Sequence, residues 1–330
     1  MSLLNYLNAI SHIRREIKIQ KQYNKDFLIP YLDELENKYH GKFHDEQRKK
    51  ILNYYGLFIT SFLCSSYKKL YGKTLSLPER KRATLFGILT PVGDDLFDID
   101  KLSNEEIRRL TFAPGDFNAT TFSSHVAREI QSFLLSDVHH RDEYLEAAKN
   151  VLDIQVETLR QTERGIPAAE IERITYTKGA VSVIIYHYTL TEKPTAEMLD
   201  ALFYIGSLFQ LGNDIFDLFK DVRDNIFTLI NTCDNYQSLR NKFLERVREQ
   251  NKRIMQLPYP EKNKREFCIT MNTINARSLV AIDKFIRQQK REKSKINWWQ
   301  KERKDMIVDM EKLPNMLRWL AYIHRLPKLK

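Results

Sequence analysis

Three oxygen-bearing side chains, Asn213, Asp217 and Asp221, recur at every fourth position of the stretch NDIFDLFKD. Residues four apart stack along one face of an α-helix, so this spacing predicts a stripe of acceptors. The residues between them are largely apolar, which favours a buried helix, and buried carboxylates need partners. A divalent cation such as Mg²⁺ prefers oxygen ligands and fits this stripe. A solvated acidic face is the alternative.

A second acidic cluster, formed by Asp94, Asp95 and Asp98, occurs earlier in the chain. Its spacings place two or three carboxylates on one helical face, with apolar Leu96 and Phe97 between them. Taken alone, an Asp-rich helix end is also explained by capping. If the two clusters face each other across a helical bundle, they would hold several Mg²⁺ ions and clamp a diphosphate.

Together the clusters resemble the two metal-binding motifs of class I isoprenoid synthases, the superfamily of terpene cyclases and trans-prenyltransferases. DDLFD at Asp94–Asp98 matches the aspartate-rich first motif. Asn213–Asp221 is similar to the second motif of microbial terpene cyclases, Asn-Asp-x-x-Ser/Thr-x-x-Lys-Glu, with aspartates at 217 and 221 as departures. The resemblance covers roughly residues 80–230. It implies a single all-α bundle domain over residues 1–330, with three Mg²⁺ ions held by Asp94, Asp95, Asp98, Asn213, Asp217 and Asp221.

The resemblance also implies basic contacts to the substrate diphosphate. Lys220 is in register with the lysine of the second motif, and Lys178 stands where the superfamily often has a diphosphate-binding residue beside a helix break. Arg173 is the preferred candidate for a diphosphate-sensing arginine. Arg303 and Arg318 are looser candidates for an arginine that closes the site. A plain solvent-exposed side chain is the alternative for Lys178.

The implied activity is that of a Mg²⁺-dependent terpene synthase, which ionises a linear prenyl diphosphate, cyclises or rearranges the allylic cation and releases diphosphate. Asp217 also fits trans-prenyl diphosphate synthases, and Asp217 with Asp221 also fits squalene- and phytoene-type head-to-head synthases, so a prenyltransferase is the alternative. The chain lacks the Gly-Gly-Lys-Arg segment typical of elongating enzymes, which favours a cyclase. Aromatic faces would shield the cation. The candidates, for which core packing is the alternative, are Phe58, Phe62, Phe86, Tyr186, Phe209 and Phe216.

The composition agrees with an all-α fold. The 330 residues are 42% hydrophobic, with only ten Gly and ten Pro, and helix-forming residue types dominate. We expect helices over most of residues 1–50, over 53–71 as an interior helix, from 78 to a kink or break at Pro91, and from a capping box at Ser103. Further helices are expected over 123–164, from 168 with a bend at Gly179, from Pro194 into the Asn213 stretch, over 235–256 and 264–291, and near the C-terminus.

The net charge of +10 is compatible with nucleic acid, an anionic membrane or an anionic small substrate as partner. No nucleic-acid-binding motif accompanies the charge, so nucleic acid is not expected. The basic C-terminal segments leave peripheral membrane contact open, and the sequence leaves a homodimer open. No long apolar run or signal peptide is evident, so we expect a soluble cytoplasmic protein.

Two other kinds of site are disfavoured. The cysteines, Cys64, Cys233 and Cys268, are scattered singly, which argues against a disulfide framework and a Cys-based zinc site. A di-iron or di-manganese carboxylate bundle normally needs Glu-x-x-His pairs, and the sequence has none.

Overall fold

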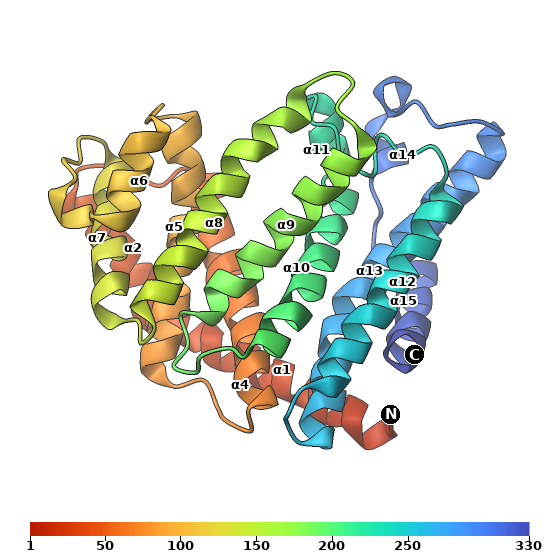
Figure 1. Cartoon of the computed structure of the whole chain (residues 1–330), viewed down its shortest axis with the longest axis horizontal. Helices are drawn as coiled ribbons and strands as arrows, with labels where there is room; N and C mark the ends of the chain where they lie inside the picture. Colours follow the sequence, from red (N-terminus) through yellow and green to blue (C-terminus); the bar gives the residue numbers. More distant parts are fainter. Residues whose placement is uncertain (330) are drawn as a thin grey trace. The chain divides into compact units, whose positions relative to one another are not determined.

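The structure is a computed structural model that describes residues 1–329. All regular elements in this range are helical and no strand occurs in it, so the all-α prediction is confirmed. The elements, with π- and 3₁₀-helical pieces labelled η, are shown in Figure 1. In chain order they are α1 (Leu3–Tyr23), η1 (Asn24–Leu28), α2 (Ile29–Lys38), α3 (Asp45–Lys49), η2 (Lys50–Cys64), α4 (Ser65–Leu70), α5 (Leu77–Asp98), α6 (Asn104–Phe112), η3 (Pro114–Asp116), α7 (Phe122–Asp137), α8 (Arg141–Thr158), η4 (Leu159–Thr162), α9 (Ala168–His187), α10 (Ala196–Phe216), α11 (Leu218–Arg223), α12 (Tyr236–Gln256), α13 (Glu261–Glu292), η5 (Trp298–Gln300), α14 (Arg303–Met306), α15 (Leu313–Arg325) and η6 (Leu326–Lys328).

The chain divides into two compact units. The N-terminal unit comprises Leu7–Lys149 and Ile185–Pro194. The C-terminal unit comprises Met1–Tyr6, Asn150–Ile184 and the chain from Thr195 onward. Helices α1, α8 and α9 contribute residues to both units. The prediction of one domain over residues 1–330 stays a prediction.

Helix α5 is the central helix of the N-terminal unit and packs against η2 and α7. It begins with a capping box in which the Ser76 hydroxyl accepts from the Glu79 N–H while the Glu79 carboxylate accepts from the Ser76 N–H. The predicted capping box at Ser103 is confirmed at the start of α6. Of the kink or break predicted at Pro91, the break is absent, because α5 continues to Asp98. Pro91 is buried within α5, which packs against η2 and α7, and the helix continues despite the hydrogen bond that proline cannot donate.

The predicted interior helix over residues 53–71 is helical in two parts. Its first part belongs to η2, which has π-helical hydrogen bonding, and its second part is α4. Ile59–Tyr67 is buried as expected, whereas Tyr54 is 45% exposed. The prediction of burial therefore holds for the second half of the segment only.

The helical region predicted over residues 123–164 is confirmed, but it is interrupted, because α7 ends at Asp137 and α8 begins at Arg141. The buried guanidinium of Arg82 in α5 explains the ending. It donates to the backbone carbonyl of Asp137 at 3.4 Å and to its carboxylate at 3.0 Å. A carbonyl at the end of a helix lacks an intrahelical donor, and here a distant side chain supplies one.

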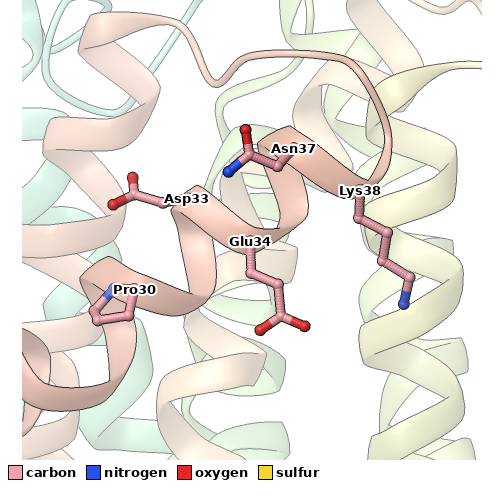
Figure 2. A pocket seen from close by; sticks show the side chains of 5 residues that line it. All are labelled: Pro30, Asp33, Glu34, Asn37 and Lys38. Carbon is pink, nitrogen blue, oxygen red and sulfur yellow. The ribbon is translucent and has the colours of Figure 1, made fainter.

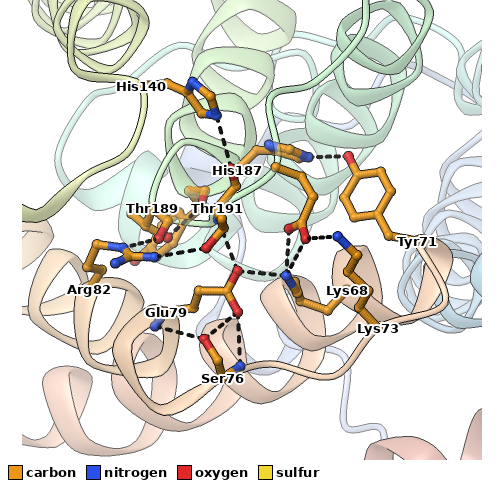
Figure 3. Close-up of polar contacts among 12 residues, drawn as sticks. Lys68, Tyr71, Lys73, Ser76, Glu79, Arg82, His140, His187, Thr189 and Thr191 are labelled. Carbon is orange, nitrogen blue, oxygen red and sulfur yellow. Dashed lines mark hydrogen bonds and ion pairs between the residues drawn. The ribbon is translucent and has the colours of Figure 1, made fainter.

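Buried charges in the N-terminal unit are paired with one another (Figure 3). The ammonium of Lys68 lies 2.7 Å from the Glu79 carboxylate and 2.6 Å from that of Glu192. Burial opposes ionisation of Glu79, but hydrogen bonds from Lys68, Ser76 and the Thr191 N–H bring its pKa down to about 2. Beside them, burial lowers the pKa of His187 to about 3, and its Nε2 lies 2.5 Å from the Tyr71 hydroxyl. These contacts join the segment around Thr191 to α4 and α5.

The core of the C-terminal unit is built by α10 to α13 with α14, η5 and η6. Trp298 lies fully buried there, donating its indole N–H to the Tyr236 hydroxyl at 2.6 Å. Helices α12, α13 and α15 run side by side in Figure 1, and α13 contacts both of the others. The predicted helices over 235–256 and 264–291 correspond to α12 and α13.

Helices α9 and α10 meet at two glycines of the C-terminal unit. A Cβ atom on Gly179 would lie 2.0 Å from the carbonyl oxygen of Gly206, and one on Gly206 would lie 2.2 Å from that of Gly179. Only glycine allows two helix backbones to approach this closely. Helix α9 is continuous through Gly179, which provides the close contact, and the bend predicted there stays a prediction.

We predict that Gly206→Ala destabilises the protein by on the order of 3 kcal/mol, because the new methyl group must push the two backbones apart. Gly93→Ala is the matched control: Gly93 also lies inside a helix, and a Cβ there meets nothing within 4 Å. It should stabilise slightly, by about 0.5–1 kcal/mol. Equilibrium unfolding in urea measures both changes. Equal stabilities of the two variants would contradict the close contact.

Candidate functional site

The second acidic motif lies at the junction of α10 and α11. Helix α10 ends at Phe216 and α11 begins at Leu218, with Asp217 between them. Backbone hydrogen bonds nevertheless continue through the junction, from the Asp217 N–H to the Asn213 carbonyl at 2.8 Å and from the Asp221 N–H to the Asp217 carbonyl at 2.9 Å. The segment predicted as one helix is therefore two helices, but residues four apart in it still lie on the same face.

Asp214, and not Asn213, is the buried side chain at the end of α10. Its carboxylate accepts from the Gln210 amide at 2.8 Å and from the Thr175 hydroxyl of α9 at 3.3 Å. Asn213 is exposed. The sequence-based set of ligands did not include Asp214. Its spacing of three residues to Asp217 and seven to Asp221 is the signal that could have identified it.

Asp221 is a buried carboxyl group whose hydrogen-bonding capacity and charge are not fully balanced by its neighbours. It is 8% exposed, and its Oδ2 atom has no hydrogen-bond partner among the described residues. Burial, followed by repulsion from Asp214 and Asp217, raises its pKa to about 8. Burial likewise raises the pKa of Asp214 to about 6, and Asp217 adds to the rise. Three mutually repelling carboxyl groups thus share one face.

Two lysines moderate this repulsion. Lys178 is half-buried on α9, and its charge lowers the pKa of both Asp214 and Asp221. Lys220 is exposed and lowers the pKa of Asp221. Both lysines predicted to contact diphosphate are therefore electrostatic neighbours of the acidic cluster. Even with these hydrogen bonds and lysines, the pKa values of Asp214 and Asp221 stay raised. An additional positive charge would therefore stabilise the ionised form of both carboxyl groups.

Two arginines lie beside the same junction. The guanidinium carbon of Arg303, on α14, is 5.4 Å from the ring centroid of Phe219. That of Arg277, on α13, is 4.8 Å from the ring centroid of Phe216. Both rings flank Asp217 in sequence. Of the two arginines considered for closing the site, Arg303 is the one that the structure brings to the second motif.

The ion pairs of Arg173 are with residues outside the acidic cluster. Its guanidinium forms ion pairs with Glu170 one turn away and with Glu157 on α8, and the hydrogen bonds that it donates to these glutamates raise its pKa. A diphosphate would therefore compete with two carboxylates for this arginine. Its role in diphosphate sensing stays a prediction.

The first acidic motif occupies the last two turns of α5, in the N-terminal unit. Asp94 and Asp98 are exposed, whereas Asp95 is half-buried and accepts from the Gln47 amide at 2.6 Å. Burial raises the pKa of Asp95, and the charges of Asp100 and Asp98 add to the rise. Asp100 is itself bound by the Thr121 hydroxyl at 2.5 Å. Exposed acids around one half-buried carboxylate fit a cation-binding helix end.

Four of the aromatic candidates pack in the N-terminal unit. Phe58 and Phe62 are stacked with ring centroids 4.9 Å apart, and Phe86 meets Tyr186 edge to face at 4.8 Å. Phe62, Phe86 and Tyr186 are buried. These contacts are those of an aromatic core, and the same faces could shield a cation.

A different hollow, on α2, lacks the character of a reaction site (Figure 2). It is lined by Pro30, Asp33, Glu34, Asn37 and Lys38, whose side chains point in different directions. Asp33 is ion-paired with Arg48 at 2.5 Å, and Lys38 with Glu129 at 2.7 Å. Two of the charged groups that line this hollow are thus already paired with neighbouring side chains.

Residues 214–221 fit a divalent cation by their chemistry. The orphaned Oδ2 of Asp221 and the raised pKa values of two buried carboxyl groups are what a cation would relieve. As they stand, no three or more His, Cys, Asp or Glu side chains within residues 1–329 are grouped so that they alone could hold a metal ion. A cation held here would complete its shell with water or substrate oxygens, as Mg²⁺ commonly does.

Comparisons with known proteins add no family assignment. No protein-family model matches the chain, and no curated protein matches it either. Within residues 1–329, no helix is both long and apolar enough to cross a membrane. Function must therefore be argued from the site itself.

We predict that metal-free protein loses stability as the pH rises from about 4 to 8, because Asp221 must ionise while buried. Its folded-state pKa is raised, so the favourable protonated form is fully present below the unfolded pKa and lost above the folded one. Asp221→Asn should remove this loss and raise the unfolding temperature at pH 9 but not at pH 4. Differential scanning fluorimetry measures the effect.

The control is Asp224→Asn, an exposed neighbour whose pKa is lowered by Arg223. It should not raise the unfolding temperature at pH 9. Added Mg²⁺ should stabilise the wild type more at pH 9 than at pH 5, because it competes with protons for the carboxylates. Parallel pH profiles of the wild type and Asp221→Asn would exclude an ionisable buried Asp221.

Proposed function

We propose that this protein is a Mg²⁺-dependent class I terpene synthase that acts on a linear prenyl diphosphate. The reaction would break the bond between the allylic C1 carbon and the diphosphate oxygen, and the bonding electrons would leave with diphosphate. The allylic cation would then cyclise or rearrange and lose a proton.

The observation that carries the proposal is the cluster of carboxylates at the α10–α11 junction, whose negative charge is not fully balanced by neighbouring groups. Asp214, Asp217 and Asp221 share a face, two of them are buried, and one oxygen of Asp221 has no partner. Unfavourable burial of charge is retained mainly where function requires it. The matching spacing of Asp94, Asp95 and Asp98 supports the same chemistry.

In this proposal the side chains bind and orient the diphosphate and do not act as nucleophiles. When bound, Mg²⁺ would stabilise the charge that develops on the departing diphosphate. Lys178 and Lys220 would donate to its oxygens, and Arg303 is placed beside the same motif to add a further contact. Thr175 and Gln210 would keep Asp214 in position through their hydrogen bonds.

A prenyltransferase of the same superfamily is the second candidate. The observation that favours it is the carboxylate of Asp217, since terpene cyclases usually have a hydroxyl residue there. Asp217 contributes to the raised pKa of both Asp214 and Asp221, so it belongs to the acidic cluster. Such an enzyme would transfer the allylic group to a second prenyl substrate.

The test is Mg²⁺-dependent diphosphate release from farnesyl and geranylgeranyl diphosphate, each supplied alone. Release with a hydrocarbon or alcohol product in mass spectrometry supports the terpene synthase. Release only when isopentenyl diphosphate is added supports chain elongation, and joining of two allylic substrates supports a head-to-head synthase. No release under any of these conditions contradicts the proposal for these substrates.

We predict that Asp95→Asn and Asp221→Asn each lower kcat for diphosphate release by on the order of 100-fold or more, because each removes a carboxylate that would hold the Mg²⁺ stabilising the leaving group. Asp224→Asn should retain wild-type activity, since Asp224 is exposed and paired with Arg223. Circular dichroism should show unchanged helicity in all three variants. Full activity of Asp95→Asn or Asp221→Asn would remove that residue from the site.

A further inference from the structure

Helix α15 presents an apolar stripe that the rest of the C-terminal unit does not cover. Leu313, Met316, Leu317 and Leu320 are 67%, 42%, 58% and 54% exposed. Their spacings of three, four and seven residues place them on one side of the helix. No residue of α15 is buried. Scattered exposed leucines are normal, but four on consecutive turns of one helix form a continuous patch.

The other side of α15 is anchored to the unit. The Trp319 indole N–H donates to the Thr273 carbonyl of α13 at 2.9 Å, and the Tyr322 hydroxyl donates to the Asp283 carboxylate. Trp319, Tyr322 and Ile323 pack against the core. The helix is therefore held in place with its apolar stripe outward. The stripe is a property of the folded unit and does not come from a detached tail.

Positive charge accompanies the stripe along α15, after the exposed acids Asp309 and Glu311 that precede the helix. From Lys312 to Leu329 the sequence has basic residues at 312, 318, 325 and 328 and no Asp or Glu. All four of these basic residues are exposed. Burial and the nearby charge of Arg318 lower the pKa of Arg287 on α13, so two arginines lie close together there. The surface beside the stripe is thus cationic.

The N-terminal segment adds apolar surface at the C-terminal end of α15. The Tyr6 hydroxyl donates to the His324 carbonyl at 3.1 Å, which holds this segment against the helix. Leu3 and Leu4, in the same segment, are 75% and 62% exposed.

We propose that the outer face of α15 is a docking surface for anionic membranes. An exposed apolar stripe with flanking Arg and Lys is the pattern by which a helix lies in the lipid interface, where anionic headgroups attract the cations. Self-association through the same stripe would bring like charges of two copies together, which disfavours a second copy as the occupant. The inference does not depend on the proposed function, because its residues lie outside the acidic motifs.

The test is flotation of the full-length protein with phosphatidylcholine vesicles that contain either no phosphatidylglycerol or about one third of it. Binding is expected only to the anionic vesicles and should weaken as salt is raised from about 0.1 to 0.5 M. Leu317→Glu with Leu320→Glu should reduce the bound fraction roughly tenfold or more. Arg318→Gln with Arg325→Gln should weaken binding while the apolar stripe stays intact.

Leu159→Glu is the matched control, because Leu159 is 67% exposed in the same unit but lies outside α15. It should bind vesicles as the wild type does. Circular dichroism and sedimentation velocity establish that each variant is folded and report its oligomeric state. Absence of binding to anionic vesicles overturns the proposal, and so does unchanged binding of Leu317→Glu with Leu320→Glu. Concentration-dependent dimers that these substitutions abolish, without vesicle binding, would assign the stripe to a second copy.

Discussion

The close approach of Gly179 and Gly206 is the contact on which the C-terminal site depends. Because no side chain separates these glycines, α9 and α10 lie backbone to backbone. One turn before Gly179, Thr175 reaches Asp214, and the charge of Lys178 acts on both Asp214 and Asp221. If the two helices lay further apart, Asp214 and Asp221 would lose these partners. Burial of the two carboxylates would then be unfavourable, because a buried charge needs a compensating partner. A packing constraint thus determines the electrostatics of the acidic cluster.

The sequence predicts those features that are encoded within a few residues. Helical periodicity identified α12 and α13, and the pair Ser103 and Glu106 identified the start of α6, because amphipathic stripes and capping are local. The break after Asp137 was missed because it depends on Arg82, which lies far away in sequence. The role of Gly179 was missed for the same reason: a glycine that allows a bend and one that allows close helix packing look alike until the partner helix is known.

The acidic motifs show the same limit at the level of single side chains. The sequence places Asn213, Asp214, Asp217 and Asp221 within one helical arc, but it does not say which of them turns toward α9. Packing of α10 against α9 and α13 settles this in favour of Asp214, since Gly206 and Gly212 face close neighbours on these helices. The chemistry of the motif was thus predictable from residue types. Its buried members were not, because burial is decided by the neighbouring helices.

The positive net charge of the chain also acquires a physical meaning from its distribution. In the N-terminal unit the buried cations Lys68, Arg80 and Arg82 each lie within 3.0 Å of a carboxylate, so they contribute little to the external field. On α15 the cations are exposed and the helix itself contains no acid. Paired charges contribute to the packing of the interior, whereas exposed charges without an opposite partner produce an electrostatic field that acts on molecules near the surface. The exposed arginines of α15 therefore contribute to the attraction of anions on the same helix that exposes Leu313, Leu317 and Leu320.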